Sequence, residues 1–287
     1  MTRLALLVGV RAVQIKMRTK MVRKSKSAVL LSFDVEEFDM PREHGGSISV
    51  EEGVRVSSEG LVRVLDLLAR EKVVATFFVT GNFAKNAPEL VKRMVREGHE
   101  VACHGVDHFC PAETDVRESK KIVEKVAGVR VLGYRQPRMF AVDYVELSRC
   151  GYVYDSSVNP AWVPGRYNHK DVPREPFVRE GVVLIPTSVF GRMRVPLFWL
   201  ALHLFPLGLY CRWAVKEMRR AGYLATYFHP WEFAEVLRDY EKVPGYVKKN
   251  SGVKLIERLH AVIDALRKAG GDFTTYGEFA RLPVDKK

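Results

Sequence analysis

The chain has 287 residues, 47% hydrophobic and 28% charged, which is enough apolar material for a folded core. Twenty-one Gly, 14 Pro and four Cys exclude a fibrous chain, a low-complexity chain and a small disulfide-held scaffold. The net charge of +12 is uneven, because residues 1–27 hold eight Lys or Arg and no Asp or Glu. The rest of the chain therefore has an ordinary charge, which gives no indication of specific nucleic-acid binding.

Residues 1–27 are predicted to form a basic, mobile arm. Its short apolar run, 4–10, is followed by basic residues where a secretory signal peptide would have small ones, so the pattern predicts a cytoplasmic protein. Met17 and Met21 lie just before the first strand candidate and are candidates for an alternative translation start. Residues 28–287 contain no long linker, and we expect them to form a single domain.

After residue 27, short apolar runs alternate with amphipathic stretches. The strand candidates are 28–34, 74–80, 100–104, 129–134, 152–155, 182–187 and 224–229. Apolar stripes at spacings of three and four mark helices between them: Leu61, Val64, Leu65 and Leu68; Leu90, Met94 and Val95; Ile256, Leu259, Ile263 and Leu266. This alternation predicts an α/β fold with a parallel sheet, open or closed into a barrel.

The segment 195–215 is apolar over about the length of a membrane span. Pro196, His203, Pro206 and Arg212 interrupt it, and these residues are costly in hydrocarbon. We therefore expect a buried or half-exposed helical excursion and no transmembrane span. The alternative is an apolar surface that faces lipid or substrate, which would allow weak association with a membrane.

The first strand candidate ends in Ser-Phe-Asp34-Val-Glu36-Glu37, and alternation places Asp34 and Glu36 on the same side. Two carboxylates at one site repel unless a cation or a shared proton lies between them. A solvated acidic strand end is the alternative.

The third strand candidate ends in His104-Gly-Val-Asp-His108, a spacing that brings two imidazoles together on a helical turn, as zinc sites often require. Gly105 would allow the turn. Cys103 and Cys110 flank the pair and suggest a rival Cys2His2 site, but Cys103 should face away from His104 on the strand. Both cysteines are therefore interpreted as packing residues.

Two further groups follow later strands: Arg135-Gln136-Pro137, and His229-Pro230-Trp231-Glu232. Taken singly, Arg135 could be a surface cation and His229 a core histidine. Together with the acidic and His pairs, each group lies at the end of a different predicted strand. Barrel and open-sheet enzymes place their functional groups at such ends.

In this order the motifs resemble those of the polysaccharide deacetylase family, which shares the NodB homology domain, over roughly residues 28–280. The matching segments are 32–36, 104–108, 135–137, 154–157 and 229–230, and Trp231-Glu232 is similar to one branch of the family. The resemblance implies a distorted (β/α) barrel of about seven strands. It also implies a metal-dependent hydrolase that removes N-acetyl groups from an N-acetylated sugar or polysaccharide.

The family resemblance further implies one divalent metal, usually zinc, with cobalt as an alternative, bound by a carboxylate and two His. Here these ligands would be Glu36, His104 and His108. The family more often uses Asp, directly after the catalytic base, so this sequence departs from the pattern. Glu37 is the rival ligand, although alternation points it away, and Asp39 is a more distant one.

The roles implied by the resemblance are a base at Asp34, a partner that orients and ionises it at Arg135, and an acid at His229. The candidate substrate-binding residues are Tyr154, Asp155, Trp162 and Trp231. Trp231 and Trp162 could stack on sugar or simply pack. Glu232 could orient His229 or cap the following helix.

Two other functions remain open. One is an amidohydrolase of a small or cyclic amide on the same fold, and the other is a catalytically silent carbohydrate-binding or scaffold protein. Residues 162–180 and 191–209 would form the loops that select the substrate. The apolar character of the second loop favours a lipid-linked or membrane-proximal sugar.

Overall fold

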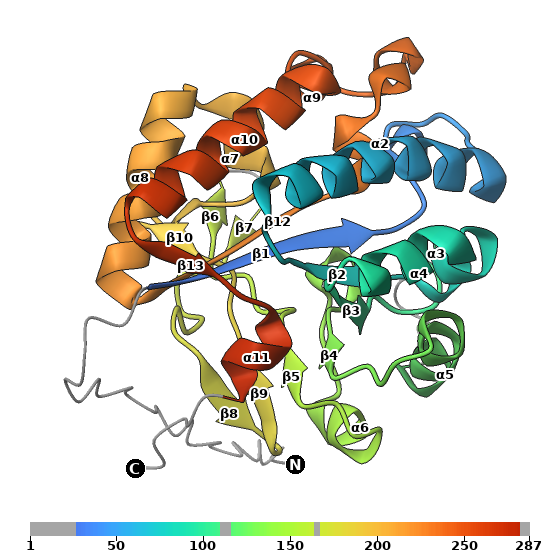
Figure 1. Cartoon of the computed structure of the whole chain (residues 1–287), viewed down its shortest axis with the longest axis horizontal. Coiled ribbons are helices and arrows are strands. Elements are labelled where there is room, and N and C mark those ends of the chain that lie inside the picture. Colours follow the sequence, from blue (N-terminus) through green and yellow to red (C-terminus); the bar gives the residue numbers. More distant parts are fainter. Residues whose placement is uncertain (1–26, 110–115, 164–166, 282–287) are drawn as a thin grey trace, which may run out of the picture.

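The computed structural model describes residues 27–109, 116–163 and 167–281. Its centre is a curled sheet (Figure 1) built of β1 (Ser27–Val35), β2 (Thr76–Val79), β3 (Glu100–Cys103), β4 (Gly133–Tyr134), β5 (Tyr154–Asp155), β8 (Phe177–Arg179), β9 (Val182–Leu184), β12 (Tyr223–Phe228) and β13 (Gly271–Phe273). The strand order is β12-β1-β2-β3-β4-β5-β9-β8, and β13 also pairs with β1. All pairs are parallel except β8 with β9. The predicted α/β fold is confirmed, and each of the seven predicted segments contributes a strand to this sheet.

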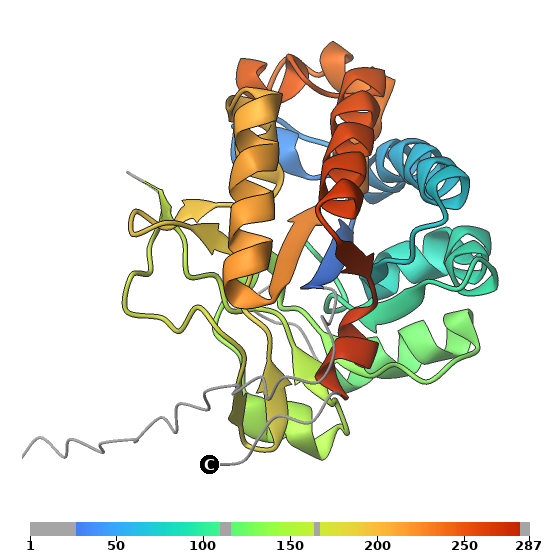
Figure 2. The same ribbon diagram turned by 60° about the vertical axis from the view of Figure 1, so that its left-hand side comes forward.

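Most helices lie around the outside of the sheet (Figure 1), whereas the last one packs against its apolar interior. The helices are α1 (Met40–Glu43), α2 (Val50–Glu71), α3 (Gly81–Asn86), α4 (Pro88–Arg96), α5 (Val116–Ala127), α6 (Tyr144–Arg149), α7 (Trp199–Leu204), α8 (Leu207–Ala221), α9 (Gly245–Lys248), α10 (Val253–Lys268) and α11 (Tyr276–Ala280). Figure 2 shows α8 and α10 side by side on one flank, where they pack together. The apolar stripes predicted in α2 and α10 are largely buried, as their spacing requires.

Short elements complete the described part of the chain. Two hairpins pair β6 (Trp162–Val163) with β7 (Tyr167–Asn168), and β10 (Val189–Phe190) with β11 (Val195–Pro196). Three short 3₁₀ turns are η2 (Pro137–Met139), η3 (Pro230–Phe233) and η4 (Glu235–Asp239). The turn η3 directly follows His229, and η2 begins two residues after Arg135.

The alternation of side chains along β1 divides the core into two sides. Val29, Leu31, Phe33 and Val35 pack with the outer helices, and Leu30 packs inside the curled sheet. Inside, the amino-terminal end of the sheet is filled by apolar groups, among them Leu30, Phe78, Ala102, Tyr154, Ala225 and Tyr276. Because that end is filled, only the carboxyl ends of the strands remain for a polar pocket.

The two ends of the sheet meet without forming a regular ladder. Ser188, shortly after β9, donates its backbone N–H to the carbonyl of Ala225 in β12 at 2.8 Å. The backbone N–H of Ala225 donates to Ser188 Oγ at 2.9 Å. One serine thus closes the curled sheet and brings the segment after β9 next to β12.

The apolar segment 195–215 forms β11, α7 and the first part of α8, and Pro206 separates the two helices. Among the described residues, no helix combines the length and apolar character that a membrane crossing requires. Trp199, Leu200, Leu202 and His203 are buried in α7. The predicted helical excursion is therefore confirmed.

Helix α2 approaches η3 closely at Gly60, where an added Cβ would lie 1.8 Å from the carbonyl oxygen of Pro230. Gly→Ala inside a helix normally stabilises by about 1 kcal/mol. Here we expect Gly60→Ala to destabilise the fold by about 1–3 kcal/mol, because backbone must move to admit the methyl group. Chemical denaturation would measure this change.

Gly208→Ala is the matched control, because Gly208 lies in α8 and nothing stands within 4 Å of its Cβ position. It should leave the free energy of unfolding unchanged or slightly raised. If Gly60→Ala were equally well tolerated, the close contact between α2 and η3 would be contradicted.

Candidate active site and metal centre

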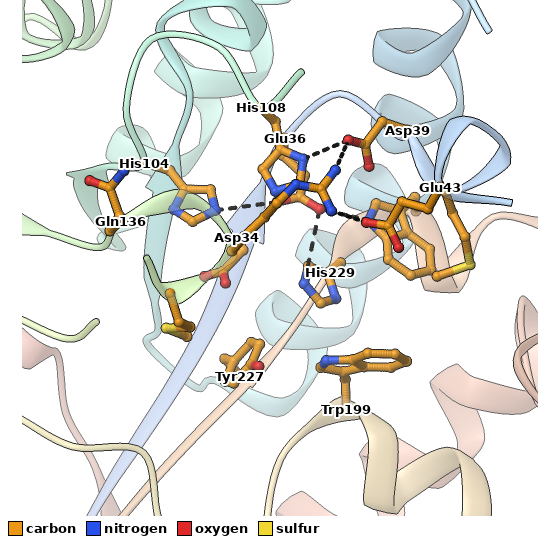
Figure 3. A pocket seen from close by; sticks show the side chains of 14 residues that line it. Asp34, Glu36, Asp39, Glu43, His104, His108, Gln136, Trp199, Tyr227 and His229 are labelled. Atoms are coloured by element: carbon orange, nitrogen blue, oxygen red, sulfur yellow. Dashed lines mark hydrogen bonds and ion pairs between the residues drawn. The ribbon is translucent and has the colours of Figure 1, made fainter. Parts of the chain in front are cut away.

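A pocket opens at the carboxyl ends of the strands (Figure 3). Its lining consists of Asp34, Glu36, Asp39, Met40, Glu43, His104, His108, Gln136, Arg138, Met139, Trp199, Tyr227, His229 and Trp231. The structure therefore brings together the acidic pair, the His pair and the late histidine, which come from three different strand ends. This is the convergence that the positions of the motifs predicted.

Three of these side chains meet at one point. Glu36 Oε2 lies 3.2 Å from His104 Nε2 and 3.0 Å from His108 Nε2. All three residues are buried, and one ligand atom of each lies within 4.8 Å of the others. Two imidazoles and one carboxylate are a donor set that catalytic zinc sites use, since three protein ligands leave a position open.

The outer nitrogens of both imidazoles are already occupied. His104 Nδ1 donates to the backbone carbonyl of Arg135 at 2.8 Å, and His108 Nδ1 lies 3.1 Å from Asp39 Oδ2. These bonds orient both rings with Nε2 toward Glu36, as second-layer partners do in metal sites. The three converging atoms, Glu36 Oε2 and the Nε2 atoms of His104 and His108, are all electron-pair donors, so a cation or protons must lie between them. The three residues therefore fit a divalent metal.

The same side chains shift one another's pKa values. Burial raises the pKa of Glu36, but attraction to His108 and His229 outweighs it, so the carboxyl pKa lies well below its usual range. Burial lowers the pKa of His108, but Glu36 and Asp39 reverse the effect and raise it well above the usual value. Protons thus occupy the cluster when no metal is bound, and a metal ion would have to displace them.

The His pair does not lie on a helical turn, so this part of the sequence prediction is wrong. Strand β3 ends at Cys103, and residues 104–109 form an irregular loop that turns at Gly105, whose φ is +74°. The carbonyls of Gly105 and Val106 accept the N–H groups of Gly81 and Asn82 at the start of α3. Because these carbonyls are occupied across the fold, the loop does not coil into a helix.

The interpretation of Cys103 as a packing residue is confirmed. Its side chain is buried among apolar residues on the helix side of the sheet. Burial raises the pKa of its thiol to about 12. Cys110 lies outside the described residues.

The rival carboxylates occupy other positions. Glu37 faces away from the pocket and accepts a hydrogen bond from Thr80 Oγ1 at 3.1 Å, and burial raises its pKa to about 7. Asp39 is outside the three-residue cluster, but it contacts His108 and also Arg138, a residue of the pocket wall. Within the described chain, Glu36 is therefore the carboxylate that meets both histidines.

Arg135 lies beneath the pocket, fully buried inside the curled sheet. Its Nη1 is 2.5 Å from Asp34 Oδ1, and Ser32 and Ser156 accept further hydrogen bonds. The guanidinium also lies 3.9 Å from the centre of the Phe78 ring. The pairing of Arg135 with Asp34 that the sequence suggested is thus present.

His229 stands on the other side of Glu36, with Nε2 4.0 Å from Glu36 Oε1. Glu232 accepts both from the backbone N–H of His229 at 2.6 Å and from its Nδ1 at 2.8 Å. Glu232 therefore orients the ring and caps the turn at the same time, so the two alternatives both hold. Burial lowers the pKa of His229, but Glu36 and Glu232 outweigh it and raise the pKa above its usual value.

The candidate substrate-binding residues separate into two groups. Trp231 lines the pocket, but its ring stacks on His229 at 4.9 Å and its Nε1 donates to Glu36 Oε1 at 3.1 Å. Tyr154, Asp155 and Trp162 are absent from the pocket lining that the structure describes. Tyr154 packs in the apolar interior, Asp155 bonds with Ser157, and the half-buried Trp162 ring contacts Lys170.

Sequence reasoning missed several residues of the pocket. Arg138 follows the Arg-x-Pro segment in left-handed backbone conformation, with φ of 56°, and pairs with Asp39 and Glu43. Trp199 comes from the apolar helix α7 and packs edge-on against His229. The sequence did contain a sign of this part of the pocket: Trp199 and His203 lie four residues apart in an otherwise apolar stretch.

Asp39 holds both His108 and Arg138, so Asp39→Ala should weaken zinc binding by about 10- to 100-fold, as loss of such partners usually does. Competition with a chelating dye would measure the affinity. Asp39→Asn keeps an acceptor for His108 Nδ1 and should lose much less. Equal zinc affinity of Asp39→Ala and the parent protein would contradict this role of Asp39.

Comparison with known proteins agrees with the motifs. Residues 22–154 match the family model described as polysaccharide deacetylase. A chitooligosaccharide deacetylase of Sinorhizobium fredii is 58% identical over 45 residues, which are 16% of this chain and 21% of the relative. A peptidoglycan-N-acetylmuramic acid deacetylase of Bacillus subtilis is 36% identical over 100 residues, covering 31% of this chain and 38% of the relative. The chain thus spans well under half of the length of these relatives.

The fold comparison extends over more of the chain. A crystal structure assigned to a polysaccharide deacetylase of Mycobacterium smegmatis superposes with a TM-score of 0.62 at 21% identity, covering 91% of each chain. At this identity the likeness concerns the fold, and the family assignment comes from the sequence matches. Residues 22–154 thus belong to a polysaccharide deacetylase domain.

Proposed function

We propose that the protein is a metal-dependent hydrolase that removes N-acetyl groups from an N-acetylated sugar or polysaccharide. The observation that carries the proposal is the meeting of Glu36, His104 and His108 in one pocket with Asp34 and His229 beside them. Relatives named as chitooligosaccharide and peptidoglycan deacetylases support an N-acetylated glycan as the substrate class.

Glu36, His104 and His108 would hold the metal, with zinc favoured by the two imidazoles and cobalt as the alternative. A divalent cation bound there would supply Lewis acidity, which polarises a carbonyl and makes water more acidic. Trp231 would orient the ligand carboxylate, because its indole N–H holds Glu36 Oε1.

Asp34 would act as the base. Arg135 holds Oδ1 of this carboxylate, and we assign the proton transfer from the attacking water to Oδ2. Arg135 is buried and bonded on several sides, so Asp34 is oriented by a group that cannot itself move or lose its charge. Without that partner, a carboxylate would have no fixed direction toward the substrate.

His229 would act as the acid that gives a proton to the departing nitrogen. Its Nδ1 is held by Glu232, which leaves Nε2 on the side of Glu36 and the pocket. The raised pKa of His229 favours the protonated imidazole, which is the form that an acid requires. Trp199 and Trp231 pack against the ring, Trp199 edge-on and Trp231 stacked.

As further parts of the proposal, the sequence favours a lipid-linked sugar as the substrate and a cytoplasmic location. An amidohydrolase of a small amide and a catalytically silent carbohydrate-binding protein are the alternatives, and the following experiment separates them from deacetylation.

Acetate release should be measured from N-acetylated chitooligosaccharides, peptidoglycan fragments and lipid-linked sugars, with metal-stripped protein and with protein given back zinc or cobalt. We expect release that depends on restored metal. No release from protein that holds one metal per chain would favour the small-amide hydrolase. No release from protein that binds no metal would favour the silent binding protein.

Two substitutions should lose activity for different reasons. Asp34→Asn should lower the rate of acetate release by about 10²- to 10⁴-fold and keep one zinc per chain, because it removes the base and no ligand. His104→Ala should lose both zinc and turnover. Metal analysis and kinetics on the same samples would check this.

Circular dichroism must accompany the Asp34→Asn measurement, since Arg135 would lose its charged partner in a buried position. Folded Asp34→Asn protein with a near-parental rate would show that another group is the base.

A further inference from the structure

Helix α7 presents two side chains, four residues apart, toward the site. Trp199 lines the pocket and packs edge-on against His229, with ring centres 5.5 Å apart. His203 lies one turn further on, with its side chain fully buried, and its Nε2 is 2.7 Å from Glu232 Oε2. The apolar segment therefore reaches the group that holds His229.

Glu232 is also fully buried and lies between two imidazoles. Its Oε2 accepts from His203, and its Oε1 accepts from the Nδ1 and the backbone N–H of His229. With both oxygens engaged, the carboxylate cannot rotate without breaking a buried hydrogen bond. The direction of Oε1, and with it the plane of the His229 ring, thus depends on His203 together with the backbone N–H of His229.

His203 is itself held in place from outside α7. Asn250 Nδ2 donates to its backbone carbonyl at 2.6 Å. Arg258 of α10 donates to the carbonyls of Leu202 and Phe205 on either side of it. The helix end that carries His203 is therefore fixed by two other segments of the chain.

Burial of the His203 side chain lowers the free energy of unfolding, because one ring nitrogen has no partner among the described residues. Within the described part of the chain, its Nδ1 is buried and has no hydrogen-bond partner. A leucine would fill the apolar helix face without an unpaired nitrogen of its own, but it would remove the partner of Glu232 Oε2. A histidine in such a place suggests a role for its second nitrogen, which bonds Glu232.

We propose that His203 is a positioning residue that, through Glu232, holds the imidazole of His229 in one orientation with Nε2 toward the pocket. The effect on catalysis rests on the proposed deacetylase function, and the effect on the His229 ring does not. The experiment therefore has two parts, one spectroscopic and one kinetic.

The spectroscopic part uses metal-free, ¹⁵N-labelled protein at one fixed pH. The Nδ1–H signal of His229, assigned by its loss in His229→Gln, should be protected from exchange with water in the parent protein. In His203→Leu we expect this signal to shift or to vanish through exchange. In His203→Gln, whose amide can still donate to Glu232, it should be retained.

The kinetic part uses zinc-loaded protein and acetate release. His203→Leu should lower kcat by about 10- to 100-fold, with KM and zinc content within about twofold of the parent values, as for other partners that orient active-site imidazoles. His203→Gln should recover most of the loss. A purely structural role would reduce the yield of folded protein and leave kcat of the folded fraction unchanged.

His99→Gln is the matched control, since His99 is another buried histidine and lies immediately before β3, away from the pocket. It should change neither the His229 signal nor kcat. An unchanged His229 Nδ1–H signal in folded His203→Leu would overturn the proposal, and so would a parental kcat. If zinc-loaded parent protein releases no acetate, the deacetylase function fails, and the spectroscopic part still decides whether His203 holds His229.

Discussion

The ion pair of Arg135 and Asp34 inside the curled sheet is the constraint around which the site is arranged. A buried guanidinium is tolerated only where its charge is paired and its N–H groups find acceptors. Arg135 meets this condition through Asp34, Ser32 and Ser156, and it also lies over the ring of Phe78. These partners come from β1, from β2 and from the segment after β5, so several strands must be in register before the charge is satisfied.

On the side of this ion pair away from the pocket, the interior of the curled sheet is largely apolar. Arg135 lies on an apolar layer, which consists of Leu30, Phe78, Tyr154 and Tyr276 of α11. Tyr276 even reaches the guanidinium through its hydroxyl at 3.3 Å. The pocket thus begins directly above a charge that is fully enclosed by protein.

Each candidate group of the pocket has a fixed partner on its outer side. Asp39 holds His108, the carbonyl of Arg135 holds His104, and Glu232 holds His229. Arg135 therefore serves two groups, since its side chain orients Asp34 and its carbonyl orients His104. Such outer contacts leave the inner atoms free to face a metal or a substrate, and they preorganise the site before either is bound.

The sequence by itself determined the alternation of strands and helices, the common side of Asp34 and Glu36, and the outward direction of Glu37, because these follow from local periodicity. It also placed His104, His108 and His229 at strand ends. The short strands β8 and β13 escaped prediction because they are brief and partly polar, and pairing with neighbours stabilises them.

Only the tertiary structure decided what depends on distant neighbours. The loop of the His pair is irregular because its carbonyls bind residues 81 and 82, and Tyr154 is excluded from the pocket by its place in the apolar layer. The function of His203 was hidden because its partner, Glu232, lies 29 positions away in the sequence. Periodicity reports which side of an element a residue faces, and only the packed fold brings two such sides together.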